Sequence, residues 1–219
     1  MNSSYKVKQI TSLYDSCNEC GLPITNCICD KAPTIKTTAK IWILSTEKEF
    51  YRASNTARLL ELVNPTSTEI FLWQRTKTPE KLVANLNNEI YEIFLVFPIE
   101  NCETESRKIE YKSTGKSTGK IPAFILLDGT WKEARKIFRR STYLKELPII
   151  SLEPNFISKY DLRRGAQEGN LCTIESVIEL LNINRETVNA KLLNEFYNLF
   201  LKSYKAGLSG HKLISANKK

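Results

Sequence analysis

Apolar runs alternate with amphipathic stretches along most of the chain. Short runs rich in isoleucine, leucine, valine and phenylalanine predict strands that are buried on both faces, because such strands read as nearly continuous apolar sequence. These runs are residues 39–45, 68–73, 91–97, 122–127 and 147–152. Since helix-like segments separate the runs, the pattern predicts an α/β domain with a mainly parallel sheet flanked by helices.

Helical periodicity marks three segments, residues 54–63, 79–89 and 187–204. Ser54 or Asn55 can cap the first helix, and Pro79 suits the first turn of the second. In the third helix, apolar residues recur at three- and four-residue spacing and predict a stripe that faces the core. The stripe comprises Val188, Leu192, Phe196, Leu199, Phe200 and Tyr204.

The run at 122–127 leads directly into Asp128, Gly129, Thr130 and Trp131. Open α/β sheets place their chemistry at the carboxyl ends of strands. The residues that follow predict a helix with its cations gathered on one face. These cations are Lys132, Arg135, Lys136, Arg139 and Arg140. An acid thus lies beside a basic stripe of the kind that binds phosphates, although a solvated surface helix is the simpler interpretation.

The composition agrees with a polyanionic partner. Lysine and arginine number 32 against 24 aspartates and glutamates, which gives a formal net charge of +8 and an isoelectric point near 9.1. Such a charge favours nucleic acid or an anionic membrane surface. There is no apolar run of about eighteen residues to span a bilayer, and residues 1–16 lack the apolar region of a secretory signal. We expect a cytoplasmic protein with no membrane association and no evident obligatory protein partner.

Four of the six cysteines fall within thirteen residues, at Cys17, Cys20, Cys27 and Cys29. Structural zinc takes four thiolates in a closed tetrahedron and stabilises segments too short to form their own core. Four free thiols or two disulfides are the alternatives, and disulfides are disfavoured in a cytosolic protein. We expect a zinc module. The two remaining cysteines, Cys102 and Cys172, are expected in the core.

The cysteine spacing and the strand pattern together predict three parts. These are an N-terminal segment with the zinc module at 1–38, an α/β domain at 39–206 and a basic polar tail at 207–219. The repeat at 112–120 contains a Gly-Lys-Ser sequence, but it leads into a strand rather than a helix, so it does not match a nucleotide-binding loop. We interpret it as a basic loop.

Two further polar clusters stand at 52–58 and 160–175. In the second, a glycine-bearing loop ends where Thr173 is expected to cap a helix with Glu175 in its first turn. Taken alone, each cluster is more simply explained as a helix cap or as a residue that complements the helix dipole.

Together, four motifs resemble the DTW-domain family in their order and spacing. The motifs are Asp128-x-Thr130-Trp131, the segment 54–59, the loop Leu162-Arg163-Arg164 and Thr173-x-Glu175. The resemblance extends over roughly residues 17–204. It implies a SPOUT-like fold, often knotted near its C-terminal part. It also implies transfer of the 3-amino-3-carboxypropyl group of S-adenosylmethionine to N3 of a tRNA uridine, with release of methylthioadenosine.

The resemblance also implies roles for individual residues. Asp128 would be the base that removes the N3 proton or an anchor for the donor amine, and Glu175 would be the second candidate for either role. Thr130 would contact the amino or carboxylate group of the donor. Trp131 would stack on a base or face the sulfonium, although plain packing is equally compatible. Arg58 would pair with the donor carboxylate.

The remaining implied contacts are to the donor and to RNA. Donor binding is expected at Asn55, Thr56, Arg58, Gly129, Leu162, Arg163, Leu171 and Thr173. Phosphate binding is expected at Lys132, Arg135, Lys136, Arg139, Arg140 and Arg164. Two other functions fit the same residues: an S-adenosylmethionine-dependent RNA methyltransferase, and a non-catalytic RNA-binding protein that contains zinc.

Overall fold

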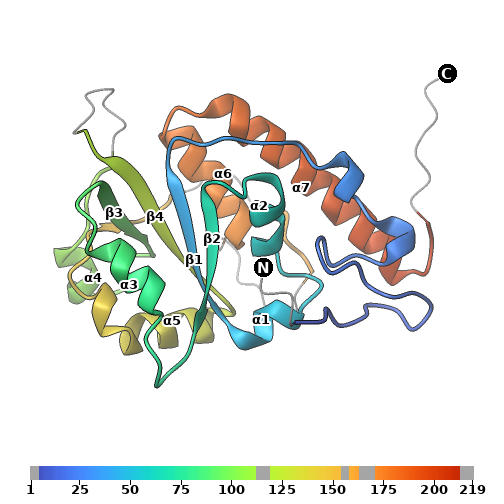
Figure 1. Cartoon of the computed structure of the whole chain (residues 1–219), viewed down its shortest axis with the longest axis horizontal. Helices are drawn as coiled ribbons and strands as arrows, with labels where there is room; N and C mark the ends of the chain where they lie inside the picture. Colours follow the sequence, from blue (N-terminus) through green and yellow to red (C-terminus); the bar gives the residue numbers. More distant parts are fainter. Residues whose placement is uncertain (1–4, 112–118, 154–157, 163–170, 213–219) are drawn as a thin grey trace.

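The chain folds around a five-stranded, all-parallel sheet with the strand order β2-β1-β4-β3-β5 (Figure 1). This computed structural model describes residues 5–111, 119–153, 158–162 and 171–212. The strands are β1 (Lys40–Thr46), β2 (Thr68–Trp73), β3 (Tyr91–Val96), β4 (Ile121–Asp128) and β5 (Ile149–Ile150). The predicted α/β class and parallel sheet are confirmed, and only the last strand is much shorter than expected.

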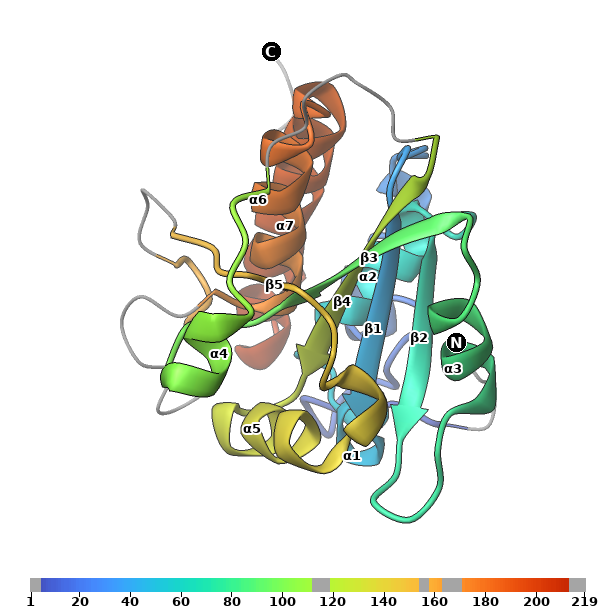
Figure 2. The same ribbon diagram turned by 90° about the vertical axis from the view of Figure 1, so that its left-hand side faces the viewer.

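Helices cover both faces of the sheet (Figures 1 and 2). One face carries α2 (Ala57–Val63), α6 (Thr173–Ile183) and α7 (Thr187–Leu208). The other carries α3 (Glu80–Leu86) and α5 (Trp131–Arg140). Along β1, Ile41 and Ile43 enter the first core while Trp42 and Leu44 enter the second. This two-sided burial is the physical reason for the continuous apolar runs.

Five shorter helical segments were not predicted. They are α1 (Glu47–Tyr51), α4 (Cys102–Ser106) and the 3-10 turns η1 (Ile24–Asn26), η2 (Cys29–Lys31) and η3 (Thr142–Leu144). Each has only one or two turns, which is too short to produce a recognisable apolar period.

The strand order makes the carboxyl ends of β1 and β4 the switch point of the sheet, the place where α/β sheets commonly have a ligand crevice. The chain leaves β1 toward one edge of the sheet, to β2, and leaves β4 toward the opposite edge, to β5. Adjacent strands whose connections diverge in this way leave an opening at their carboxyl ends, where ligands of α/β proteins bind. The parallel register pairs Ser45 with Asp128 at this position.

Three helix starts differ from the predicted caps. The N-cap of α2 is Thr56 rather than Ser54 or Asn55, and its side chain forms no capping bond. The N-cap of α6 is Cys172, so Thr173 is the first helical residue. Pro79 is the N-cap of α3. In α2 and α6 the predicted caps Asn55 and Thr173 donate to Asp128 instead, as described below.

The predicted apolar stripe of α7 is correct only in its second half. Phe196, Phe200 and Tyr204 are buried, but Val188 is 73% exposed and Leu192 is 36% exposed. Leu193 is buried in place of Leu192, and adjacent positions differ by about 100° around a helix. The start of α7 therefore presents a different face to the core than the apolar pattern indicates.

The N-terminal segment shares the core of the α/β domain. Val7, Leu22, Ile28 and Ile35 are buried in the same cluster as α2, α6 and α7. The Asn26 side-chain amide donates to the carbonyls of residues 203 and 211 at 3.2 and 2.9 Å. This packing ties the cysteine segment to the end of α7.

Several other expectations can be compared with the structure. Cys102 is exposed at the start of α4, contrary to the prediction, because α4 lies at the surface. Cys172 is half-buried against the first core. The helix α7 continues to Leu208, beyond the predicted start of the tail. Most of the basic loop, residues 112–118, lies outside the described residues. The SPOUT-like topology and the knot stay predictions.

Within the described part of the chain, no helix combines the length and the apolar character needed to cross a membrane.

Candidate active site at the carboxyl end of the sheet

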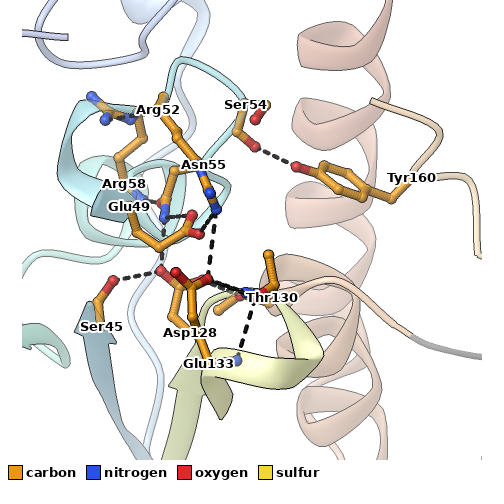
Figure 3. Close-up of polar contacts among 11 residues, drawn as sticks. Ser45, Glu49, Arg52, Ser54, Asn55, Arg58, Asp128, Thr130, Glu133 and Tyr160 are labelled. Carbon is orange, nitrogen blue, oxygen red and sulfur yellow. Dashed lines mark hydrogen bonds and ion pairs between the residues drawn. The ribbon is translucent and has the colours of Figure 1, made fainter. Parts of the chain in front are cut away.

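Asp128, the last residue of β4, is the centre of a buried polar cluster. The residue is only 4% exposed to solvent. Oδ2 accepts hydrogen bonds from Ser45 Oγ and Asn55 Nδ2, both at 2.7 Å, and Oδ1 accepts one from Thr173 Oγ1 at 2.6 Å. The donors come from β1, from the segment before α2 and from the start of α6. Figure 3 shows the first two, Ser45 and Asn55, beside Asp128. One carboxylate therefore joins three elements.

All three donors to Asp128 are neutral groups, and none of the ion pairs seen among the described residues involves this carboxylate. A carboxylate has roughly four lone-pair positions. Among the residues that the structure describes, Oδ1 accepts a hydrogen bond only from Thr173, which leaves acceptor capacity on this oxygen. A buried carboxylate with neutral partners is suited to receive either a proton or a cationic group of a ligand.

Asn55 orients this carboxylate from the segment before α2. Its Nδ2 also donates to Glu49 Oε2 at 3.1 Å, and its Oδ1 accepts from the backbone N–H of Arg58 at 3.3 Å. Because both ends of the amide are engaged, the NH₂ group must face the two carboxylates. Asn55 thus bridges Asp128 and Glu49 (Figure 3).

Glu49 was missed by the sequence reasoning. The residue is 0% exposed, and its carboxylate forms an ion pair with Arg52. Arg52 also lies 3.9 Å from the carboxylate of Glu133 in α5. A buried glutamate needs a cation, and Arg52 three residues later was the only available signal. Nothing in the local sequence indicated that Glu49 lies beneath the active-site cluster.

The start of α5 has a structural explanation for each residue of its motif. Thr130 is the N-cap, and its hydroxyl donates to Glu133 Oε2 at 2.7 Å and accepts from the Glu133 N–H at 3.3 Å. A Cβ on Gly129 would lie 2.9 Å from Glu133 Cβ, so the close approach requires glycine. Trp131 packs edge-on against Phe97, with ring centroids 6.4 Å apart.

Glu133 is held as a carboxylate by this cap. Burial acts to raise the pKa of Glu133, but hydrogen bonds from the Thr130 backbone and side chain, together with Arg52, outweigh it and lower the pKa below its ordinary value.

Glu175 is fully engaged in holding the start of α6. Oε1 accepts from the Lys159 N–H at 2.8 Å and from Tyr197 Oη at 3.3 Å, while Oε2 accepts from Ser158 Oγ at 2.6 Å and the Cys172 N–H at 3.0 Å. The residue is 3% exposed. Burial also raises the pKa of the adjacent Cys172 thiol to about 12, so this thiol stays protonated.

Two more contacts fasten the start of α6 to the segment before α2. Thr56 Oγ1 accepts from the Ile174 N–H at 3.3 Å. Tyr160 Oη donates to the Ser54 carbonyl at 2.8 Å (Figure 3). The structure thus brings the predicted donor-binding residues Asn55, Thr56 and Thr173 to one place.

The other predicted donor-binding positions are more dispersed. Leu162 packs against the first core, and Leu171 directly precedes the cap of α6. Arg163, together with Arg164 of the predicted RNA contacts, lies outside the described residues.

Arg58 is turned toward the cysteine segment. Its Nη1 donates to the carbonyl of Asn18 at 3.0 Å, and its Nη2 donates to those of Phe50 and Arg52 at 2.9 and 3.3 Å. The residue is 1% exposed, and burial lowers the pKa of the guanidinium. In this geometry Arg58 clamps the cysteine segment to residues 50–52, and its predicted pairing with a donor carboxylate stays a prediction.

The four N-terminal cysteines form a compact cluster. The Sγ atoms of Cys17 and Cys29 are 3.7 Å apart, those of Cys20 and Cys27 are 3.8 Å apart, and all four lie within 4.8 Å of one another. A tetrahedron with Zn–S bonds of about 2.3 Å has edges of about 3.8 Å, so the thiols fit zinc. Burial raises the pKa of Cys20 to about 12, and zinc would supply the charge that favours the thiolate.

The cluster contacts the active-site segment directly. Gly21, directly after Cys20, has φ +81°, and a Cβ there would lie 2.8 Å from the Ala53 carbonyl oxygen. Together with the Arg58 clamp onto Asn18, this close packing sets the position of the segment that carries Asn55.

The sequence profile of the DTW domain matches residues 14–205, which includes both the cysteine cluster and the Asp128 cluster. The chain belongs to the DTW family. The predicted family is therefore confirmed. Over 174 residues the chain is 25% identical to tRNA-uridine aminocarboxypropyltransferase 2 of Drosophila melanogaster, and the match covers 77% of the chain and 66% of that protein. The matched region thus spans slightly less than two thirds of this relative. No solved structure matches the chain.

The basic helix of this DTW domain divides its cations between two environments. Arg135 is paired with Glu100, its Nη2 2.8 Å from Oε1. Lys132 is exposed near the start of the helix. The other three predicted cations, Lys136, Arg139 and Arg140, line a cavity of about 380 Å³ together with Arg75, which was not predicted. Arg75 precedes the first residue of α5, Trp131, by 56 positions in the sequence (131 − 75 = 56), so only the fold brings them together.

Proposed function

We propose that this DTW-family protein transfers the 3-amino-3-carboxypropyl group of S-adenosylmethionine to N3 of a uridine in tRNA and releases methylthioadenosine. The name of the Drosophila relative supports tRNA uridine as the acceptor. The single observation that carries the proposal is the buried Asp128 carboxylate, which lies at the β1/β4 switch point with acceptor capacity remaining. The adjoining basic helix supports a polyanionic substrate.

The chemistry requires a proton acceptor and a fixed orientation. The N3–H of uridine loses its proton, the N3 lone pair forms a bond to Cγ of the donor, and the Cγ–S bond breaks with its electron pair passing to the sulfonium sulfur. Orientation of the donor decides whether this carbon or the methyl group is attacked. Asp128 Oδ1 is the proposed acceptor of the N3 proton.

The same carboxylate is also a candidate anchor for the donor ammonium. Its hydrogen-bond partners are neutral, which leaves its negative charge available for a cationic group. The two roles differ in kinetics. Loss of a base lowers kcat, whereas loss of an anchor raises the KM for S-adenosylmethionine. Glu175, with both oxygens engaged, is the weaker candidate for either role.

We place the donor between the segment before α2, the turn at Gly129 and the start of α6. Asn55, Thr56 and Thr173 border this space, and Arg163 with the leucines at 162 and 171 completes the proposed set. Thr130 and Trp131 keep their proposed contacts to the donor and to the target base in addition to their capping and packing roles.

For the RNA, the proposed phosphate contacts are Lys132, Lys136, Arg139, Arg140 and Arg164. Arg135, which the sequence also predicted as a contact, is paired with Glu100, so we propose no phosphate contact for it. An unpaired base is the expected target, because single-stranded loops let a base leave the stack. We propose structural zinc at the four N-terminal cysteines. A cytoplasmic location agrees with cysteines that are all free thiols.

The test is incubation of the protein with unmodified tRNA and S-adenosylmethionine, followed by mass spectrometry of the nucleosides and of the small-molecule products. Methylthioadenosine and a uridine that carries one aminocarboxypropyl group would establish the reaction. S-adenosylhomocysteine with a methylated nucleoside would replace it by methyl transfer. Binding of tRNA without any product would favour the non-catalytic alternative.

A further inference from the structure

Four cations surround one cavity at the end of α5. Lys136, Arg139 and Arg140 come from the last turns of this helix, and Arg75 comes from the segment after β2. All four are exposed, and the cavity they line has a volume of about 380 Å³. We call these four residues the cation pocket. It lies on the side of the sheet covered by α3 and α5 (Figure 2).

The charges of the cation pocket are not neutralised by acids. Among the described residues, every ion pair found lies elsewhere: Arg135, one turn away on the same helix, is paired with Glu100, whereas none of the four pocket cations is paired. Like charges gathered around one cavity repel each other. Favourable interactions with the C-terminal dipole of α5 can account for Arg139 and Arg140, but Arg75 is not part of that helix.

Trp73 contacts one of the pocket cations and links the two segments that carry the pocket. Lys136 Nζ lies 5.7 Å from the centre of the Trp73 ring, a cation–π contact. Trp73 Nε1 donates to Ser141 Oγ at 3.0 Å, and Ser141 is the C-cap of α5. Trp73, buried at the end of β2, therefore holds the last turn of α5 beside the segment that carries Arg75.

The chemistry of the pocket matches a phosphate group. Guanidinium groups present planar pairs of N–H donors that bind phosphate oxygens bidentately, and three of the four cations are arginines. A cavity of this size is sufficient for a phosphate with an attached sugar. We infer that the cation pocket binds a backbone phosphate of the RNA substrate. This inference rests on the proposed function.

The position of the pocket indicates which phosphate is bound. Trp131 begins α5 three residues after Asp128, and Arg139 lies eight residues further along the helix, or about 12 Å along its axis. A phosphate in the pocket therefore belongs to a nucleotide near the target and not to the target itself. Binding there would hold the strand while the reactive base lies at the β1/β4 switch point.

The experiment measures RNA binding in the absence of S-adenosylmethionine. Fluorescence anisotropy with end-labelled tRNA is recorded for the wild-type chain, Arg75→Gln and Arg139→Gln over a series of KCl concentrations. Each variant should raise the Kd about fivefold to tenfold near 0.15 M salt and reduce the slope of log K against log salt by about one. Because both residues are exposed, thermal unfolding of each variant should match the wild type.

Arg135→Gln is the matched control, because it removes the same charge from the same helix but its guanidinium is paired with Glu100. Its Kd should stay within about twofold of wild type. Equal weakening by Arg135→Gln and Arg75→Gln would reduce the pocket to a net-charge effect and overturn the inference. Unchanged binding by Arg75→Gln and Arg139→Gln would also overturn it.

Competition with inorganic phosphate and pyrophosphate separates a backbone phosphate from a free anion. Tight pyrophosphate binding that Arg75→Gln abolishes, with tRNA affinity unchanged, would assign the pocket to a small anion and overturn the RNA inference. The methylthioadenosine assay is read separately. Pocket-dependent tRNA binding without methylthioadenosine release would retain the inference and reject the proposed function; a raised KM for tRNA in the variants with an unchanged kcat would support both.

Discussion

Asp128 and Glu175 are two buried acids with nearly the same exposure, 4% and 3%. They differ in their donors. Glu175 accepts from two backbone N–H groups and two hydroxyls, all close to the start of α6 or packed against it. Within the described part of the chain, Asp128 accepts only from side chains, which belong to three separate elements.

The difference has a chemical consequence. A backbone N–H in a folded segment cannot turn away, so loss of Glu175 would leave buried donors without partners. Hydroxyl and side-chain amide groups can rotate and share an acceptor with a ligand. Burial alone therefore does not distinguish a candidate site acid from a structural acid, whereas the remaining acceptor capacity and the type of donor do.

The largest expected effect is on turnover. Asp128→Asn should lower kcat or kcat/KM by roughly 10²–10⁴-fold, since it removes a group that accepts a proton or a cation. Glu175→Gln should retain turnover within about tenfold if the fold is kept, because this residue acts only through the start of α6. Release of methylthioadenosine measures both. Comparable losses in the two variants, with both proteins folded, would erase the distinction.

Removal of the proposed zinc should loosen the segment around Asn55, which donates to Asp128, more than the segment around Glu175. Cys20→Ser, or zinc chelation, should lower the free energy of unfolding by about 3 kcal/mol or more, because the four thiolates and their zinc would form the interior of this short segment. Arg58 and Gly21 link that segment to the residues before α2. Hydrogen exchange should therefore increase first at residues 49–58.

The control for this experiment is the start of α6. The contacts of Arg58 and Gly21 link the cysteine segment to residues 50–53 and not to the start of α6. Exchange at residues 172–176 should change less than at 49–58. A uniform increase in exchange, or bound zinc at less than one equivalent in the wild-type protein as prepared with zinc, would contradict the proposed coupling.

Glu175→Ala should destabilise the fold by about 2 kcal/mol, because the N–H groups of Lys159 and Cys172 lose a buried acceptor. Ser45→Ala removes one donor to Asp128 and leaves its two other donors, so its expected cost is smaller, about 1 kcal/mol. Urea unfolding at neutral pH compares the two. A larger loss for Ser45→Ala would reverse the assignment of which acid supports the fold.

The smallest effect concerns the cap of α5. Thr130→Ala should cost about 1 kcal/mol at neutral pH. The Glu133 pKa is lowered by folding from an ordinary value of 4.5, so its stabilisation is fully present above that value and is lost as the pH falls through the lower folded pKa. The penalty of Thr130→Ala should therefore shrink below about pH 4. Thermal unfolding at pH 7 and pH 3.5 tests this; an equal penalty at both pH values would contradict it.

Much of the fold was accessible from local pattern. The four long strands were found within one or two residues, and the strand that ends in Asp128 was recognised as the centre of the site. The errors occurred where packing overrides pattern: at the start of α7, where Val188 and Leu192 face solvent, and at Cys102 in a surface helix. A local apolar period cannot indicate which part of a helix meets the core.

The candidate site was predicted only in part. Asp128, Asn55, Thr56 and Thr173 were identified through motifs, but their mutual contacts were not. Glu49, buried beneath Asn55, carried no local signal, and Arg58 turned out to face the cysteine segment.

By itself, the sequence determined the alternation of strands and helices, the acid at a strand end, the spacing of the four cysteines and the basic face of α5. These features are local. Side-chain periodicity indicates the strands, the helices and the basic face, and the need of structural zinc for four ligands explains the four closely spaced cysteines. Only the tertiary structure decided that Ser45, Asn55 and Thr173, separated from Asp128 by 83, 73 and 45 residues, share one carboxylate. It likewise placed Arg75 beside α5. The reason is that strand order and register choose which segment ends meet, and no local periodicity encodes that choice.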